Sequence, residues 1–395
     1  MAEPAVPAPP QGPAPWRNPR VRAVAFQVVA LLLLLWFFWT IFNNTLTNME
    51  SRGITTGFGF LDNTAGFGIL FSLIPYDETN TYGRTFVVGL LNTLLVSGLG
   101  ILFATIIGFI LGIARLSPNW LIGKMALVYI EITRNIPLLL QIFFWYFAVL
   151  RTVPGPRESV EFPLGAFLNN RGLYVPAPQV ESSFWFVVAT FGAAIVGAVA
   201  LLRWAKNRQD TTGRRFPAWP VSLAMVVGLP LLVFWIIGAP LTWDIPELKG
   251  FNFKGGMRLI PEFIALWLAL TLYTASFIGE IVRSGIQAVS HGQTEASQAL
   301  GLKRGQSLRL IVIPQAMRII IPPLTSQYLN LTKNSSLATA IGYPDLVSVF
   351  MGTSLNQTGQ AVEIVAMTMA VYVAISLTIS LLMNLYNRAV ALKER

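Results

Sequence analysis

A polar run inside an otherwise apolar stretch is the part of this chain best suited to bind a ligand. The ammonium group of Lys333 attracts a carboxylate, and the amide and hydroxyl groups that follow it are hydrogen-bond donors. Pro314, Pro322 and Pro323 predict interruptions of the helix that carries this run. We predict a polar pathway for a solute, with a purely architectural hydrogen-bond network as the alternative. The pathway residues are Gln327, Asn330, Lys333, Asn334 and Ser335.

Two pairs of opposite charges lie within or beside apolar segments. Glu131 and Arg134, like Glu280 and Arg283, are three residues apart, a spacing that places both members on one face of a helix. Ionisable groups in membrane segments are costly and normally pair or face a polar interior. The four residues predict either gates or structural ion pairs, and the first pair could also simply anchor the interface. Pro137 predicts a break directly after the first pair.

The sequence lacks the residue groups of an enzyme. It has no Ser/His/Asp or carboxylate constellation and no G-x-x-x-x-G-K-[ST] phosphate-binding loop. The absence of Cys excludes disulfides and Cys-ligated metals, and a single histidine, His291, excludes His-rich metal sites. We therefore predict no catalytic residue, no metal site and no cofactor in this chain.

The elements that position these side chains are predicted to be membrane helices. The mean hydropathy is +0.60 and only 12% of residues are charged, whereas soluble proteins carry about a quarter. Several apolar runs approach the roughly 20 residues needed to cross a bilayer. We therefore predict an all-α, polytopic membrane protein. Its eight spans are 24–42, 86–114, 121–150, 184–202, 221–240, 262–287, 310–341 and 361–386.

The distribution of Lys and Arg predicts the orientation of these spans. With the N-terminus in the cytoplasm, most basic residues fall on the cytoplasmic side, most densely over 203–215. The C-terminus and the loop 288–309 are then cytoplasmic. The segments 43–85, 151–183 and 241–261 become external loops that mainly connect helices. The net charge of +10 reflects this bias, so we predict no nucleic-acid partner.

The cytoplasmic segment 291–314 predicts a short surface helix, Gln293–Leu302, closed by Gly301. A helix with such small side chains can seat in a groove of a soluble partner at low ordering cost. Its Glu-Ala-Ser run, the Gly six residues after the Glu and the later Ile-Pro resemble the EAA loop of ABC-importer permeases. The resemblance implies that the loop docks on an ATPase and transmits its motion. The coupling residues so implied are Glu295, Ala296, Ser297, Ala299, Gly301 and Arg304.

Further segments resemble the same family in the same order. The motifs N-T-L-L-V-S and G-x-x-L-G-I-A-R within 89–115 are similar to the first core helix of polar-amino-acid ABC permeases. The run K-N-S-S-L at 333–337 matches their Lys-Asp/Asn-Thr/Ser-Ser-Leu signature, while Ser284 replaces a family glycine. The resemblance covers 86–150 and 262–388. It is closest to the larger permease subunit of general L-amino-acid or glutamate/glutamine/aspartate/asparagine importers.

This resemblance implies a five-helix permease core with two additions, in a bacterial inner membrane. The implied partners are an ATP-binding-cassette ATPase dimer that uses ATP and Mg, a second homologous permease, a periplasmic amino-acid-binding protein and an amino-acid substrate. The predicted parts are a disordered cytoplasmic tail (1–23), an extra helix with an external loop (24–85), the first part of the core (86–150), an insertion with two extra spans (151–260) and the second part of the core (261–395).

Two other functions are consistent with part of the sequence. An ion-coupled secondary transporter would use Glu280, Arg283 and Lys333 as relay groups and would need no ATPase. It leaves the EAA-like loop unexplained, and no inverted repeat of broken helices is apparent. A membrane scaffold or enzyme subunit would move no solute, which the polar run argues against.

Overall fold

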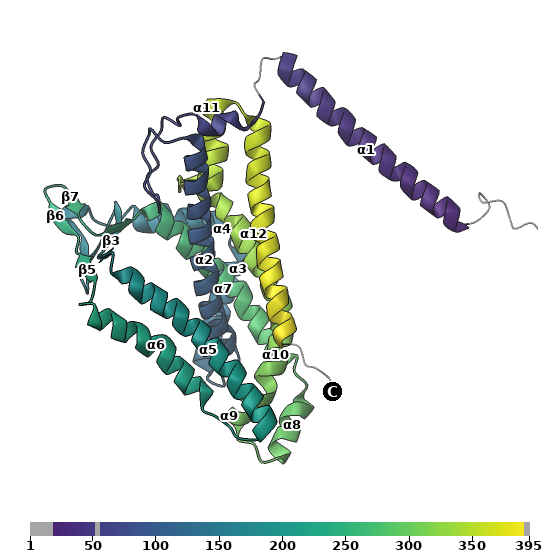
Figure 1. The fold of residues 1–395 in the computed structure, drawn as a ribbon, viewed down its shortest axis with the longest axis vertical. Coiled ribbons are helices and arrows are strands. Elements are labelled where there is room, and N and C mark those ends of the chain that lie inside the picture. Colours follow the sequence, from purple (N-terminus) through teal and green to yellow (C-terminus); the bar gives the residue numbers. More distant parts are fainter. Residues whose placement is uncertain (1–18, 52–55, 391–395) are drawn as a thin grey trace, which may run out of the picture.

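The computed structural model describes residues 19–51 and 56–390, and long helices dominate it (Figure 1). Seven helices in these residues are long and apolar enough to cross a membrane, and the number rises to eight if one bent pair of helices is counted as a single span. They coincide with the eight predicted spans, so the all-α prediction is confirmed. The helices are α1 (Pro19–Ser51), α2 (Tyr82–Arg115), α3 (Trp120–Asn135) with α4 (Leu138–Phe143) and η3 (Phe144–Leu150), α5 (Phe184–Thr212), α6 (Ala218–Ile236), α7 (Pro261–Gln287), α10 (Ile313–Asn334) and α12 (Ala361–Val390).

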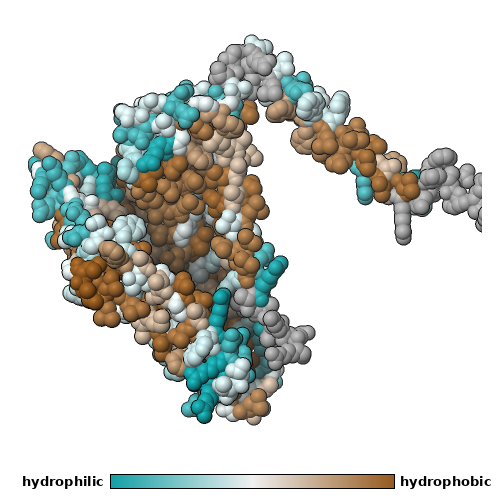
Figure 2. Space-filling model, in the orientation of Figure 1, coloured by the Kyte–Doolittle hydropathy of each residue, from teal (hydrophilic) through white to brown (hydrophobic). Residues whose placement is uncertain are grey.

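Two parts of the molecule lie outside the central bundle. α1 stands apart in Figure 1, and none of its apolar stretch is buried within the chain. α5 and α6 pack against each other and not extensively against any other helix. Their outward side chains contribute to the broad apolar areas of Figure 2, which require a lipid environment. Residues 1–18 of the predicted tail lie outside the described residues, and α1 already begins at Pro19.

The bundle is centred on the contact between α2 and α7. A Cβ added at Gly108 would lie 2.5 Å from the side chain of Ile278, and one at Gly112 would lie 2.7 Å from the carbonyl oxygen of Gly279. Small residues let two membrane helices approach closely, since lipid provides no hydrophobic force to join them. The glycines of α2 therefore determine how α7 is placed, and α7 carries Glu280 and Arg283.

α10 is continuous, contrary to the predicted interruptions. Pro314 lies at the start of α10, directly after the π-helical turn η5 (Leu308–Val312), and the helical backbone runs through it without a break. Pro322 and Pro323 lie inside the helix, as membrane helices permit when neighbouring groups satisfy the freed carbonyls. The break comes later, at Ser335, where the backbone tightens into the 3₁₀ helix η6 (Ser335–Ile341). The polar run therefore lies at the end of one long helix.

The predicted break at Pro137 is confirmed. α3 and the α4–η3 segment that follows it are bent by 104° relative to each other. Ile136 is extended, as expected for a residue before proline. The side-chain amide of Gln141 donates to the carbonyl oxygens of Thr133 (2.8 Å) and Ile136 (2.9 Å). These bonds satisfy backbone groups that the break would leave without partners.

Two of the loops predicted to be external contain strands that the sequence did not predict. One sheet has the order β1-β2-β3-β8, and two antiparallel pairs, β4·β5 and β6·β7, lie beside it in the chain. The β3·β8 and β4·β5 pairs join the two predicted external loops to each other. The strands are β1 (Val160–Phe162), β2 (Ala166–Asn169), β3 (Gly172–Val175), β4 (Ala177–Val180), β5 (Leu241–Asp244), β6 (Glu247–Lys249), β7 (Asn252–Lys254) and β8 (Met257–Leu259).

A buried carboxyl group lies between the last two spans, just before η7 (Val347–Ser354). Asp345 is fully buried, and its oxygens accept hydrogen bonds from the Ser348 N–H (2.8 Å) and the Tyr372 hydroxyl (3.5 Å). Tyr372 is the titratable side chain that bonds to it. Burial raises the pKa of the Asp345 carboxyl from 3.8 to about 7, although hydrogen bonds from nearby backbone N–H groups oppose the rise.

Asp345→Asn is expected to remove a pH dependence of stability. The folded chain holds the Asp345 proton more tightly than the unfolded chain, so its stabilisation is complete below the unfolded pKa of 3.8 and is lost as pH rises through about 7. Each pKa unit corresponds to about 1.4 kcal/mol. The melting temperature in detergent should therefore fall between about pH 5 and about pH 8 in the wild type and stay nearly flat in the variant. The exposed Asp210→Asn is the control, and a wild-type slope in Asp345→Asn would contradict this account.

Candidate functional site

The short helix α8 (His291–Ala299) begins two residues earlier and ends three residues earlier than predicted. It ends because Gly301 adopts a left-handed conformation, with φ +76°. The Gly301 N–H donates to the Gln298 carbonyl (2.8 Å) and the Leu302 N–H donates to the Ser297 carbonyl (3.1 Å). These two bonds form a Schellman motif, which fixes both the end of α8 and the direction of the chain beyond it.

Two side-chain hydrogen bonds fasten α8 to the elements that follow. The hydroxyls of Ser297 and Ser307 are 2.5 Å apart, and Ser307 belongs to α9 (Arg304–Ser307). Since the Ser297 hydroxyl already donates to the Thr294 carbonyl (2.7 Å), Ser307 supplies the hydrogen between the two serines. The Gln315 amide, at the start of α10, donates to the Gln293 side chain (3.2 Å). These bonds fasten α8 to α9 and to the start of α10.

The predicted coupling residues do not all face the same way. Ser297 is buried, with 1% of its surface exposed, so it belongs to the attachment of α8 and not to its outer face. The most exposed apolar side chain of this region is Leu300, at 79%, which sequence reasoning had not selected. The Glu295 carboxylate lies 3.0 Å from the His291 ring, and both side chains are exposed. The other exposed members are Ala296, Ala299, Gly301 and Arg304.

A groove separates α8 from the neighbouring ends of the spans. It has a volume of about 1020 Å³ and is lined by Ile110 and Ile113 of α2, Val282 of α7, and Thr294 and Gln298 of α8. Apolar side chains dominate its walls. The groove leaves room for α8 to shift relative to α2 without unpacking the α2·α7 contact.

The predicted pathway residues divide into an exposed face and a buried end of α10. Asn330 and Lys333 are exposed, Gln327 and Asn334 are half-buried, and Ser335 is buried. The Ser335 hydroxyl donates to the Thr332 carbonyl (2.7 Å) and is thereby satisfied locally. In the described residues, no acidic side chain forms an ion pair with Lys333. An exposed ammonium on a membrane helix must face protein or water, because hydrocarbon cannot solvate it.

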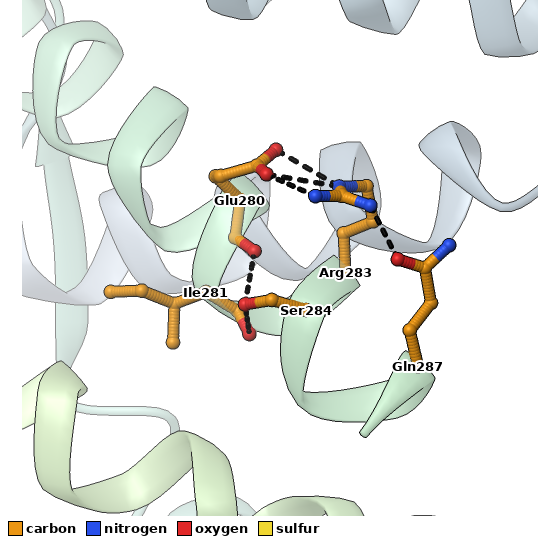
Figure 3. Close-up of polar contacts among 5 residues, drawn as sticks. All are labelled: Glu280, Ile281, Arg283, Ser284 and Gln287. Atoms are coloured by element: carbon orange, nitrogen blue, oxygen red, sulfur yellow. Dashed lines mark hydrogen bonds and ion pairs between the residues drawn. The ribbon is translucent and has the colours of Figure 1, made fainter. Parts of the chain in front are cut away.

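Glu280 and Arg283, predicted as either a gate or a structural ion pair, form an ion pair (Figure 3). The Arg283 Nε lies 3.0 and 3.1 Å from the two Glu280 carboxylate oxygens, and its terminal nitrogens bond to Glu280 and Gln287. The Ser284 hydroxyl donates to the Glu280 carbonyl (2.8 Å). About a quarter of each charged side chain is exposed, at 26%. A bidentate pair of this kind holds the last turns of α7 together.

Glu131 and Arg134, which their spacing allowed to pair, lie apart from each other. No ion pair joins them in the part of the chain that the structure describes. The Arg134 guanidinium lies over the ring of Phe277, 5.0 Å from its centre, because α7 offers an aromatic face at that height. Glu131 accepts hydrogen bonds from the Asn135 amide on its backbone carbonyl (2.7 Å) and its side chain (3.5 Å). The i, i+3 spacing permitted the pair but did not require it.

Sequence reasoning missed the residues that join the coupling helix to α10. Ser307 lies ten residues beyond its partner Ser297, and Gln315 lies 22 residues beyond Gln293. Neither spacing is a helical repeat, so no periodic pattern marks these bonds. Only Gln315 stands out in the sequence, as a polar residue on an otherwise apolar turn.

Comparison with known proteins agrees with this architecture. Residues 213–393 match the family described as binding-protein-dependent transport system inner membrane component. The chain is 58% identical to the ABC transporter permease protein YhdX of Escherichia coli (strain K12), over 98% of each chain. It is 52% identical to the general L-amino acid transport system permease protein AapQ of Rhizobium johnstonii, over 96% of this chain and 94% of AapQ.

A third relative is also similar to this chain over nearly its whole length. The chain is 42% identical to the glutamate/glutamine/aspartate/asparagine transport system permease protein BztB of Rhodobacter capsulatus, over 95% of each chain. Near-complete coverage of all three relatives includes α1, the external strands and the α5–α6 pair, so these additions are shared features and not an appended domain. The chain therefore belongs to the family of binding-protein-dependent transport system inner membrane components, as the resemblance to ABC-importer permeases predicted.

Proposed function

We propose that this chain is the permease of an ATP-binding-cassette importer that moves polar L-amino acids from the periplasm to the cytoplasm. The observation that carries the proposal is the attachment of α8 to α10, because α10 bears the polar face with Lys333. A partner that moves α8 moves that face. The names of AapQ and BztB, which refer to L-amino acids and to glutamate, glutamine, aspartate and asparagine, support the substrate class.

The partners follow from the surfaces that this chain leaves exposed. A cytoplasmic ATPase dimer, using ATP and Mg, docks on the outer face of α8 around Glu295 and Leu300. A second homologous permease covers the exposed face of α10, since Asn330 and Lys333 cannot face lipid. A periplasmic binding protein delivers the amino acid on the opposite side. Both termini of the chain are cytoplasmic in this inner-membrane arrangement.

Transport then proceeds by alternating access between two arrangements of the helices. ATP binding shifts the equilibrium only if the ATPase contacts α8 more favourably in one arrangement than in the other. A shift from 1:99 to 99:1 needs about 5.5 kcal/mol of such preference. The bonds that fasten α8 to α9 and α10 transmit the shift to the polar face, and ATP hydrolysis reverses it. The Glu280–Arg283 pair, near the same end of α7, is a candidate gate.

The first test is purification of the tagged chain from its native membrane, followed by uptake measurements in proteoliposomes. We expect an ATPase and a second permease to co-purify, and uptake of glutamate or glutamine to require ATP and a binding protein. Recovery of the chain alone, with uptake driven by an ion gradient, would replace this proposal with the secondary transporter.

Lys333→Met is expected to reduce amino-acid uptake at least about tenfold, since hydrogen bonds to charged groups contribute about 1.5–3 kcal/mol. Lys333→Arg keeps the charge and should retain part of the activity. The matched control is Lys124→Met, an exposed lysine of α3, which should transport normally. Radiolabelled uptake and co-purification of the ATPase are measured together. Wild-type uptake by Lys333→Met would remove Lys333 from the pathway.

A further inference from the structure

The α5–α6 pair meets lipid on most of its surface. The two helices pack closely, since a Cβ added at Gly197 of α5 would lie 3.0 Å from the methyl of Met225 on α6. Outward side chains such as Val196 (71% exposed) and Leu232 (59%) are large and apolar. Neither helix packs extensively on another described element. The pair therefore behaves as a lipid-embedded hairpin beside the bundle (Figure 1).

The dimensions of this hairpin place its tip at the membrane surface. α6 has 19 residues and a length of about 28 Å, which matches the roughly 30 Å hydrocarbon core. α5 has 29 residues and a length of about 44 Å, so its last turns extend beyond that core. The ring of Trp204, on α5, lies 5.6 Å from the ring of Phe216, which directly precedes the N-cap of α6. Together with the exposed Trp219, they form an aromatic layer of the kind found at the interface.

Basic residues are concentrated at and directly beyond this aromatic layer. All are exposed, and none forms an ion pair among the residues that the structure describes. The segment 203–215 contains a single acid, Asp210. The Arg208 guanidinium folds back over Trp204, 5.2 Å from the ring centre, and so lies at the level of the aromatic layer. The basic residues are Arg203, Lys206, Arg208, Arg214 and Arg215.

We propose that the hairpin tip 203–215 binds the phosphate groups of anionic phospholipids in the cytoplasmic leaflet. Clusters of Lys and Arg directly beyond a membrane helix attract anionic headgroups, and each cation near the surface strengthens the attraction about fivefold. The headgroup region extends about 5–7 Å beyond the hydrocarbon core. Lys206 and Arg208 lie within that distance of Trp204 along α5, at about 1.5 Å per residue. The tip therefore meets phosphates without any change of backbone conformation.

The cytoplasmic assignment of the tip rests on the proposed function, because α8 and the end of α5 lie at the same end of the molecule (Figure 1). Hydrophilic surface gathers at this end in Figure 2. An acidic surface of the ATPase is the competing occupant of the tip. The aromatic layer argues against it, since tryptophans at this height position the cations among headgroups and not in the aqueous phase.

The test uses the purified permease complex in detergent, titrated with phosphatidylglycerol or phosphatidylcholine, with bound lipid counted by native mass spectrometry. We expect the wild type to prefer the anionic lipid, and the preference to weaken as salt is raised. Arg214→Gln combined with Arg215→Gln should lower the affinity for phosphatidylglycerol about twenty-fivefold, at about fivefold per cation. Arg214→Lys with Arg215→Lys should keep it.

The charge-matched control is Lys249→Gln with Lys254→Gln in the external β6·β7 pair, which should bind phosphatidylglycerol like the wild type. Equal binding of both lipids by the wild type overturns the proposal. So does a double glutamine variant that loses the ATPase but keeps the lipid, since the tip would then be an ATPase surface. A wild-type complex that binds phosphatidylglycerol through the tip but never recovers an ATPase supports the lipid site and contradicts the proposed importer.

Discussion

Gly301→Ala is expected to reduce ATP-driven uptake about five- to thirtyfold while leaving the protein folded in the membrane. The Gly301 φ of +76° is left-handed, and a residue with a Cβ pays roughly 1–2 kcal/mol there. That penalty corresponds to a five- to thirtyfold fall in the population with an intact α8 terminus. Loss of the Schellman bonds also redirects Leu302 and the α9 segment that holds Ser307. We therefore expect weaker ATPase recovery as well as slower uptake.

Gly305→Ala is the matched control, because it makes the same change four residues later. No atom lies within 4 Å of a Cβ added at Gly305, and its backbone is not left-handed. It lies in the helical turn α9, where alanine is favourable. Uptake and ATPase recovery are compared for both variants at equal membrane content. Equal activity of the two alanine variants would show that the α8 terminus has no part in coupling.

Gly112→Val is expected to cause a large loss of stability. A Cβ at this position would lie 2.6 Å from the Val282 Cβ and 2.7 Å from the Gly279 carbonyl oxygen, and a backbone atom cannot move without shifting α7. Overpacking of a dense interface costs typically 1–3 kcal/mol, and the larger side chain raises this further. Because α7 carries the Glu280–Arg283 pair, transport should fall together with the melting temperature.

Gly98→Val separates this clash from the general effect of valine in a helix. Gly98 lies on the exposed side of α2, and no atom is within 4 Å of a Cβ built there. We expect near-wild-type yield and melting temperature in detergent for Gly98→Val, and a clear decrease in both for Gly112→Val. A similar loss in the two variants would mean that helix propensity, and not the α2·α7 contact, limits stability.

The sequence predicted the parts of this fold that depend on local composition. Twenty-residue apolar runs, the proline at 137 and the glycine at 301 act within a few residues, so the spans, the bend and the end of α8 were all predictable. The continuity of α10 was not predictable, because the effect of Pro322 and Pro323 depends on neighbouring groups that donate hydrogen bonds to the freed carbonyls. The strands β1 to β8 were also not predicted, since they are only three or four residues long.

The site was predictable only where partners lie one helical turn apart. Glu280 and Arg283 satisfy this condition and do pair. Arg134 does not pair with Glu131, because a ring on a different helix, Phe277, competes for the guanidinium. The bond between Ser297 and Ser307 depends on the turn that follows α8, and the burial of Asp345 depends on three separate helical segments. Tertiary contacts of this kind leave no periodic trace in one sequence.

The antiparallel pairing of β4 with β5 makes the α5–α6 hairpin a separate unit in the topology of the chain. The chain leaves for the hairpin at Ala177 and returns at Asp244, and these two residues are direct partners across the pair. The segment between Ala177 and Asp244 is thus a single closed loop whose two ends lie side by side. Its removal would leave the order and direction of the bundle helices unchanged, so the hairpin and the bundle can be varied independently of each other.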